Sequence, residues 1–310
     1  MQYKNILIAG PYEEEFNRQL PTNFQQAIRF VPVDEVTNED LLWADIYVGS
    51  KPSPNFHFEN IKWVHSFNAG VNNFLELEGW AEQDVLLTRT ICSFGQRISE
   101  YCLSYVLREL QYQPYFEKKQ LEKIWARKTP KMIKDQTIVI FGTGEIGQEV
   151  ARTFSQFGAR VYGVSQSGKQ KEFFYDIVTP SRCESYVSEA DWIISTLPLT
   201  EQTSGMFNQK LFSYFNQAVF LNVGRGATVI EADLIQALNE RKVRQAVLDV
   251  FSTEPLPVDS ELWERKDVII TPHISAVTDL DEAITCFFDT LKKVENGEEL
   301  SNKVNFSKGY

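Results

Sequence analysis

Short apolar runs alternate with polar stretches of helical pattern along most of the chain. In the first ninety residues they predict strands at 5–10, 45–50, 62–67 and 85–90. Further along the chain they predict strands at 137–142, 159–165, 191–197, 218–224, 245–250 and 267–272. Several of these runs are apolar at nearly every position, which is typical of parallel strands covered by helices on both faces. The pattern therefore predicts two parallel α/β regions.

A long helical pattern lies between these two regions. Apolar residues recur at steps of three and four from about residue 97 to 126, as at Ile98, Cys102 and Val106. Pro114 is expected to break or kink this helix because proline lacks the backbone N–H. A final helix is predicted from about 278 to 294. The long helix reads as a connection between domains.

Composition and charge narrow the class of protein. A chain of 310 residues favours two domains, and 43% hydrophobic residues suffice for packed cores. The net charge of −11 argues against a nucleic-acid partner, and no apolar stretch is long enough to span a membrane. Four widely spaced cysteines fit reduced thiols in the cytoplasm, and three histidines without ligand spacing predict no metal site.

A glycine motif follows the first strand of the second region. Gly142, Gly144 and Gly147, with Glu145 and Ile146 between them, form GxGxxG at a predicted strand–turn–helix junction. Glycines permit a tight turn and let the backbone approach a pyrophosphate, which the helix N-terminus then binds. The motif predicts a dinucleotide site; the alternative is a plain tight turn.

The loop after the next predicted strand bears on the choice of cofactor. An NAD site usually carries Asp or Glu about 20 residues after the glycines, but Ser165 stands at that place here. Donors suited to a 2′-phosphate follow at Ser165, Ser167, Lys169 and Lys171. The usual arginine is absent, with Gln166 near its place. We expect NADP(H) to be favoured over NAD(H), unless this is an ordinary polar loop without influence on the cofactor.

Three polar residues stand in apolar frames at predicted strand ends. They are Arg225 in VFLNVGRGA, Glu254 in LDVFSTEPLP and His273 in VIITPHISA. Charged side chains are rarely buried unless they are paired, so stability alone does not explain them. Together they can bind a carboxylate, move a proton and orient the group that moves it, which indicates an enzyme acting on an oxyacid.

These motifs together resemble the D-isomer-specific 2-hydroxyacid dehydrogenases, and most closely the glyoxylate/hydroxypyruvate reductase-like members. The matching stretches, in order along the chain, are 66–74, 98–107, 141–151, 195–203, 221–229, 248–257 and 271–276. The resemblance implies a doubly wound Rossmann domain inserted into a smaller flavodoxin-like α/β substrate domain. It places the substrate domain at 1–97 and 277–310, the nucleotide domain at 98–276, and predicts a homodimer.

The resemblance also assigns roles to the three polar residues. Arg225 would hold the substrate carboxylate and touch the C2 carbonyl oxygen, for which a planar, permanently charged fork is suited. His273 would donate the proton as hydride arrives at C2. Glu254 would bind the imidazole, fixing its tautomer and favouring the protonated ring.

Further contacts are expected from the same resemblance. The backbone N–H groups of Ala69, Gly70 and Val71 would receive the substrate carboxylate. Asp249 would lie near the nicotinamide carboxamide, although an acid that caps a turn is nearly as good a reading. Other cofactor contacts are expected at Leu197, Pro198, Thr203 and Val223, where a plain strand-to-turn connection competes.

The predicted function is reduction of a small 2-keto acid to the D-2-hydroxy acid. One alternative is oxidation of 3-phosphoglycerate, for which Lys51 could supply a cation near the phosphate. Another is a non-catalytic protein of the same fold that senses dinucleotides, as some corepressors do. The intact set of Arg225, Glu254 and His273 favours the enzyme.

Overall fold

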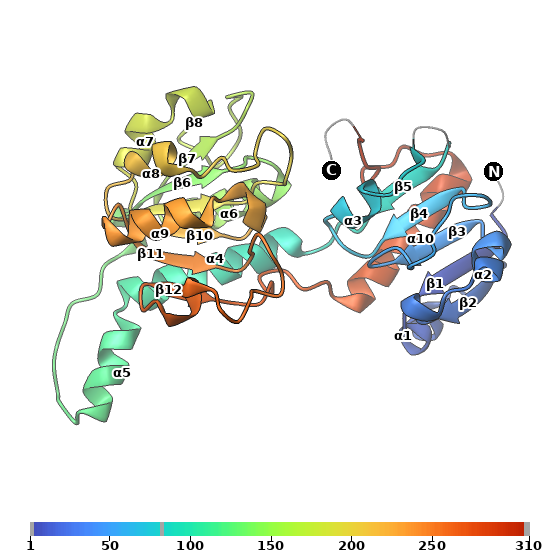
Figure 1. Cartoon of the computed structure of the whole chain (residues 1–310), viewed down its shortest axis with the longest axis horizontal. Coiled ribbons are helices and arrows are strands. Elements are labelled where there is room, and N and C mark those ends of the chain that lie inside the picture. Colours follow the sequence, from blue (N-terminus) through green and yellow to red (C-terminus); the bar gives the residue numbers. More distant parts are fainter. Residues whose placement is uncertain (1–2, 81–83, 307–310) are drawn as a thin grey trace. The chain divides into compact units, whose positions relative to one another are not determined.

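The computed structural model describes residues 3–80 and 84–306. It divides into two compact units, one formed by Met1–Phe94 with Thr278–Tyr310 and the other by Gly95–Val277. We call them the five-stranded and the seven-stranded unit after their parallel sheets (Figure 1). The predicted α/β fold class is confirmed.

The five-stranded unit has the strand order β2-β1-β3-β4-β5, which is the flavodoxin-like order. Its strands are β1 (Asn5–Ala9), β2 (Ala27–Val31), β3 (Ile46–Gly49), β4 (Trp63–Ser66) and β5 (Leu86–Arg89). Its helices are α1 (Glu13–Gln19), η1 (Val33–Glu35), α2 (Asn38–Trp43), α3 (Asn72–Leu75) and α10 (Leu280–Asn296). Ile6 and Ile8 pack with Phe287 of α10, whereas Leu7 packs with Leu41 of α2, so the sheet is buried on both faces.

The seven-stranded unit has the order β12-β11-β10-β9-β6-β7-β8. Its strands are β6 (Thr137–Phe141), β7 (Arg160–Val164), β8 (Asp176–Val178), β9 (Trp192–Ser195), β10 (Ala218–Asn222), β11 (Val243–Leu248) and β12 (Val268–Ile270). Because the chain runs outward from β6 through β7 and β8 and then continues at β9, the order reverses between β6 and β9. In open α/β sheets ligands bind at such a switch point, beyond the carboxyl ends of the strands.

Helices cover both faces of the seven-stranded sheet. The helices of this unit are α4 (Phe94–Leu110), α5 (Gln113–Leu121), η3 (Ile133–Asp135), α6 (Glu145–Gln156), η4 (Pro180–Arg182), α7 (Glu184–Ser188), α8 (Gln209–Ser213), η5 (Gly226–Thr228), α9 (Glu231–Asn239) and η6 (Glu261–Glu264). Val106 of α4 and Phe154 of α6 pack in one core, and Phe212 of α8 and Leu234 of α9 pack in the other.

The expected helix from 97 to 126 is wrong in its extent. It is two helices, α4 and α5, separated at Tyr112, whose φ of 54° is left-handed. Pro114 stands in the first turn of α5, where its missing N–H costs nothing, so the break precedes it. Helix α5 ends at Leu121, and none of its residues is buried. Strands β2 and β8 were not predicted.

Candidate active site

The glycine loop follows β6 and ends in the first turn of α6. Gly142 has a φ of +97°, and a Cβ added at Gly147 would lie 1.8 Å from the Gly142 carbonyl oxygen. Both positions therefore require glycine. A Cβ at Gly144, the residue before α6, would meet nothing within 4 Å, so this side of the loop is open. With no side chain capping α6, its N-terminal N–H groups can bind an anion, and the loop fits a pyrophosphate.

The loop after β7 carries two features that suit a phosphorylated ribose. The Ser165 hydroxyl is buried and makes no hydrogen bond within the described residues. The Lys171 ammonium donates to the carbonyl oxygen of Thr143 at 2.5 Å, which holds a positive charge against the glycine loop. Gln166, Ser167 and Lys169 are exposed. A buried hydroxyl without a partner is costly unless a ligand satisfies it.

The segment after β9 is organised by Thr203. Its hydroxyl donates to the Pro198 carbonyl oxygen at 2.5 Å and accepts from the Thr200 N–H at 2.8 Å. Leu197, Thr203 and Val223 are buried. The Thr203 hydroxyl thus builds the turn, and a cofactor contact of these residues stays a prediction.

Arg225 is held by backbone packing on both sides. A Cβ at Gly224 would lie 2.5 Å from the Leu197 carbonyl oxygen, and one at Gly226 would lie 1.8 Å from the Phe251 carbonyl carbon. The chain around Arg225 therefore passes directly against the loops after β9 and β11. Because any side chain at either glycine would collide with backbone, the position of Arg225 is fixed by its neighbours.

The Arg225 side chain keeps most of its donors available. Its Nη1 donates to the Gly224 carbonyl oxygen at 2.7 Å. The guanidinium has five N–H donors, and among the described residues no other acceptor bonds to them. Burial lowers the pKa of the Arg225 guanidinium, while the negative charge of Glu254 opposes that shift. A partly desolvated cation with free donors suits a carboxylate ligand.

Glu254 and His273 form a direct pair. Glu254 Oε2 lies 2.8 Å from His273 Nδ1, and its Oε1 accepts from the Phe251 N–H at 2.9 Å. Because an ionised carboxylate only accepts, Nδ1 carries the proton in this pair. No described residue bonds Nε2, and 48% of the His273 side chain is exposed. The arrangement leaves Nε2 free to exchange a proton.

Asp249 lies beneath the loop that carries His273. It is fully buried, and its carboxylate accepts from the Thr271 hydroxyl at 2.6 Å and from the N–H groups of Ile274 and Ser275 at 2.8 Å. These contacts are those of an acid that organises a turn. The expected contact with the nicotinamide carboxamide stays a prediction.

The expected carboxylate-binding loop lies in the five-stranded unit, after β4. The side-chain amides of Asn68 and Asn73 donate to the Ser50 carbonyl oxygen at 3.1 and 2.9 Å, which fixes both ends of the loop. Among the described residues nothing accepts from the backbone N–H groups of Ala69, Gly70 and Val71, the first three of the four residues between them. These donors are available to an anion.

Four residues that shape the seven-stranded site were missed by sequence reasoning: Gly224, Gly226, Tyr101 and Thr271. The glycines on either side of Arg225 were a usable signal, because adjacent glycines often mark close backbone approach. The hydrogen bond between Tyr101 and Thr271 joins positions 170 residues apart. No local sequence pattern predicts such a contact.

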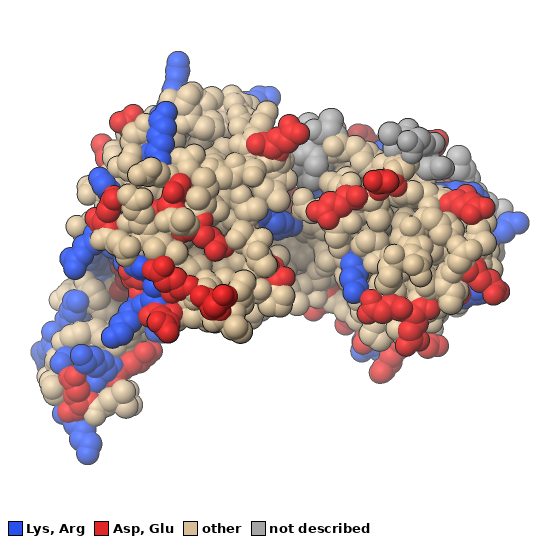
Figure 2. Space-filling model, in the orientation of Figure 1, with Lys and Arg blue, Asp and Glu red and all other residues tan. Residues whose placement is uncertain are grey.

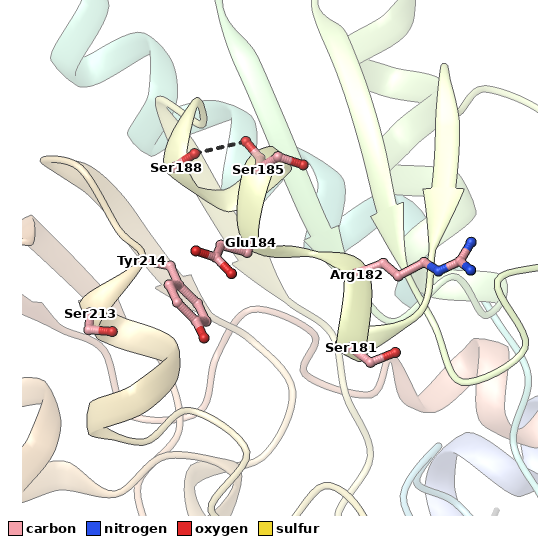
Figure 3. A pocket seen from close by; sticks show the side chains of 7 residues that line it. All are labelled: Ser181, Arg182, Glu184, Ser185, Ser188, Ser213 and Tyr214. Atoms are coloured by element: carbon pink, nitrogen blue, oxygen red, sulfur yellow. Dashed lines mark hydrogen bonds between the residues drawn. The ribbon is translucent and has the colours of Figure 1, made fainter.

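An open pocket elsewhere in this unit is separate from the site. Its walls come from η4, α7 and α8, and it is lined by Ser181, Arg182, Glu184, Ser185, Ser188, Ser213 and Tyr214 (Figure 3). None of these is a predicted site residue. Within residues 3–80 and 84–306 no cluster of His, Cys, Asp or Glu could hold a metal ion, and no helix there could cross a membrane.

Comparisons with known proteins agree on one family. Residues 103–275 match the family model described as "D-isomer specific 2-hydroxyacid dehydrogenase, NAD binding domain". Glyoxylate/hydroxypyruvate reductase A of Yersinia enterocolitica is 33% identical over 81% of this chain and 82% of its own.

Two solved structures are similar over nearly the whole chain. A D-isomer specific 2-hydroxyacid dehydrogenase family protein of Aeromonas salmonicida has a TM-score of 0.87 at 30% identity, covering 98% of this chain and all of its own. The NADPH-dependent glyoxylate/hydroxypyruvate reductase of Sinorhizobium meliloti, in complex with NADP and sulfate, has a TM-score of 0.88 at 28% identity, covering 99% and 100%. The chain belongs to the D-isomer specific 2-hydroxyacid dehydrogenase family.

Proposed function

We propose that this chain reduces a small 2-keto acid of the glyoxylate or hydroxypyruvate type to the D-2-hydroxy acid, with NADPH as the hydride donor. The observation that carries the proposal is the Glu254–His273 pair, whose carboxylate also acts on the partly buried Arg225. A 2-keto acid presents a carboxylate to a cation and a carbonyl oxygen to a proton donor. The curated relative from Yersinia and the NADP complex from Sinorhizobium carry names that support this assignment.

The residues of the set have different tasks in this reaction. Arg225 binds the substrate carboxylate and polarises the C2 carbonyl through its free N–H donors. His273 gives the proton on Nε2 to the carbonyl oxygen, while Nδ1 keeps its proton and its bond to Glu254. When bound, NADPH supplies the hydride for C2, and in the reverse direction His273 takes the proton back.

The cofactor assignment rests on the loops after β6 and β7. The open side of the glycine loop and the first turn of α6 would hold the pyrophosphate. The buried Ser165 hydroxyl and the Lys171 ammonium would face the 2′-phosphate, where an acidic residue would repel it. We therefore propose NADPH over NADH. Asp249, Leu197, Pro198, Thr203 and Val223 are proposed as further cofactor neighbours.

The substrate is proposed to be an unphosphorylated acid. The N–H groups of Ala69, Gly70 and Val71 are proposed to receive a substrate carboxylate. Lys51, which a phosphate group would need, is already paired with Asp34 at 3.2 Å. A cation held by a neighbouring carboxylate is a poorer partner for a phosphate, so 3-phosphoglycerate is the weaker candidate.

We further propose that the chain is a cytoplasmic homodimer formed through the seven-stranded unit. Helix α5 projects from that unit (Figure 1), and its residues and those that follow it expose apolar side chains, with Leu121 at 85% and Trp125 at 92%. Lys, Arg, Asp and Glu side chains are also present on this arm (Figure 2). Large exposed apolar groups often mark a protein interface. Four free cysteines fit a reducing compartment.

Sedimentation equilibrium tests the dimer. The wild type is expected at twice the mass of one chain, and Trp125→Glu is expected to shift it toward the monomer. A monomeric wild type would contradict the dimer, and an unchanged dimer in the variant would exclude this surface as its interface.

Turnover with a panel of acids tests the function. Oxidation of NADPH or NADH is followed by absorbance with glyoxylate, hydroxypyruvate, pyruvate, phenylpyruvate and, in the reverse direction, 3-phosphoglycerate. We expect the highest kcat/KM with NADPH and glyoxylate or hydroxypyruvate. Absence of turnover with every acid, alongside tight NADPH binding, would instead support a dinucleotide sensor.

A further inference from the structure

The backbone at His273 is strained. Its φ of 54° lies in the left-handed region, which a residue with a side chain enters only at a cost. The His273 N–H donates to the Asp249 carbonyl oxygen at 2.8 Å, so one bond at the residue itself helps to hold this conformation. Such a conformation persists only when several surrounding contacts hold the backbone in place. The other contacts that hold His273 therefore come from neighbouring residues.

Asp249 supplies further restraint on the loop that carries His273. The buried Asp249 carboxylate accepts from donors on both sides of His273, namely the Thr271 hydroxyl before it and the Ile274 and Ser275 N–H groups after it. One carboxylate thus joins the two ends of a five-residue turn. His273 is carried at the top of this turn, where its ring reaches Glu254.

Helix α4 supplies the next contact. The Tyr101 hydroxyl lies 2.6 Å from the Thr271 hydroxyl. Because the single proton of the Thr271 hydroxyl goes to Asp249, which only accepts, Tyr101 must be the donor in this bond. Burial, together with the negative charge of Asp249, raises the pKa of the Tyr101 phenol, which keeps it protonated for that role. The next residue, Cys102, is fully buried in the core of the unit, so the helix is a firm support.

We propose that Tyr101 is a positioning residue for His273, acting through the chain of hydrogen bonds Tyr101–Thr271–Asp249. The proposal rests on the function assigned above to His273. The Tyr101 hydroxyl orients Thr271, Thr271 orients the Asp249 carboxylate, and that carboxylate fixes the turn that aims Nε2. Removal of the hydroxyl is expected to loosen the aim of His273 while leaving binding of the 2-keto acid unchanged.

Kinetics of matched tyrosine variants test this role. Tyr101→Phe is expected to lower kcat about tenfold at unchanged KM, because a small misplacement of a reacting group is costly. Tyr105→Phe is the control, since its ring packs against that of Tyr101 on the same helix, with 4.8 Å between the centroids, and its hydroxyl lies outside the hydrogen-bond chain. Equal kcat values for the two variants would overturn the proposal, as would a change in KM alone.

A rescue and a double variant separate positioning from general damage. Thr271→Ser keeps the hydroxyl and should retain activity, whereas Thr271→Val should match Tyr101→Phe. In a His273→Gln background, Tyr101→Phe should have no further effect on kcat, because the residue it positions is gone. Additive losses in the double variant would contradict the proposal.

A spectroscopic measurement keeps the test independent of activity. The chain has three histidines, so their imidazole proton resonances can be resolved, and His273→Gln identifies the signal of His273. Tyr101→Phe should shift or broaden that signal alone, and Tyr105→Phe should leave it in place. An unmoved His273 signal would overturn the positioning role even if no acid is turned over, whereas a moved signal without turnover would count only against the proposed function.

Discussion

Two histidines occupy opposite surroundings in this chain. His65 lies within β4 of the five-stranded unit and is fully buried, with Nδ1 2.8 Å from the Thr88 hydroxyl and Nε2 3.5 Å from the Thr90 hydroxyl. His273 follows β12 of the seven-stranded unit, is about half exposed, and pairs with a carboxylate. His65 is thus part of a core, whereas His273 lies at the surface of the candidate site.

Both ring nitrogens of His65 have hydrogen-bond partners, so neither is available to exchange a proton with a ligand. Trp63 donates to the Thr88 hydroxyl, which can then donate to Nδ1, and the Thr90 hydroxyl donates to the Ser66 carbonyl oxygen. Burial lowers the pKa of His65 to about 3, so the ring is neutral at ordinary pH and connects two strands. A proton donor instead needs a free nitrogen and an exposed ring; no described residue bonds Nε2 of His273, and about half of its side chain is exposed. Surroundings decide which histidine can do chemistry.

The largest expected effect is the loss of activity in His273→Gln. Without the proton donor, kcat should fall about 1,000-fold, within the range for general acid catalysis, while the melting temperature changes little. His57→Gln is the control, because His57 contacts Asn38 in the five-stranded unit, outside the site. If His273→Gln kept wild-type kcat, the two histidines would not differ in the way described.

The next effect is acid destabilisation through His65. The pKa of His65 is lower in the folded than in the unfolded chain, so the unfolded chain binds more protons between about pH 6.5 and pH 3. Across that window the folded state becomes less stable as the pH is lowered. From this group, the free energy of unfolding should drop by up to about 1.4 kcal/mol for each unit by which the pH is lowered. Urea unfolding between pH 7 and pH 5 measures it.

His65→Gln serves as the comparison for that slope. The variant is less stable at pH 7 because buried hydrogen bonds are lost, but the part of the pH dependence that belongs to His65 should disappear. The same slope in both proteins would show that His65 is not the group that titrates.

A smaller effect is expected from Glu254→Gln. The amide removes the charge beside His273 and can reverse the hydrogen bond to Nδ1, so kcat should fall about tenfold, at the lower end for groups that orient a reacting imidazole. Glu231→Gln is a control outside the pair, since Glu231 binds Ser252. An effect as large as that of His273→Gln would mean that the tautomer fixed by the carboxylate matters as much as the imidazole itself.

The smallest effect is expected from Thr90→Val. Its hydroxyl makes the longest contact of the buried histidine, at 3.5 Å, and a bond of 3.0 Å to the Ser66 carbonyl oxygen. Loss of these should cost about 1 kcal/mol of unfolding free energy, without a change in kcat. A cost well above that would show that the outer bond of His65 matters as much as the inner one.

The sequence predicted those parts of the molecule that local patterns specify. Apolar runs located most strands, and the glycine spacing after β6 located a loop in which Gly142 and Gly147 are required by geometry. Arg225, Glu254 and His273 stood out as charged or titratable residues in apolar frames, and the structure joins Glu254 to His273 directly.

The rest depends on contacts between distant segments. Strand β2 has only partly buried or exposed residues, so its apolar pattern is weak. The turn beneath His273 depends on Asp249, Thr271 and Tyr101, which are far apart in the sequence and are brought together by the tertiary fold. Whether an acid at a strand end contacts a ligand or holds its own loop is decided by those neighbours.

Transfer of a deuterium label tests the central claim most directly. Wild-type protein and His273→Gln are each mixed with hydroxypyruvate and NADPH deuterated at the transferable position of the nicotinamide, and the product is analysed by mass spectrometry and chiral chromatography. The account predicts D-glycerate with deuterium at C2 from the wild type, and a rate about 1,000-fold lower from the variant at equal NADPH affinity. Unlabelled product, or equal rates from the two proteins, would contradict it.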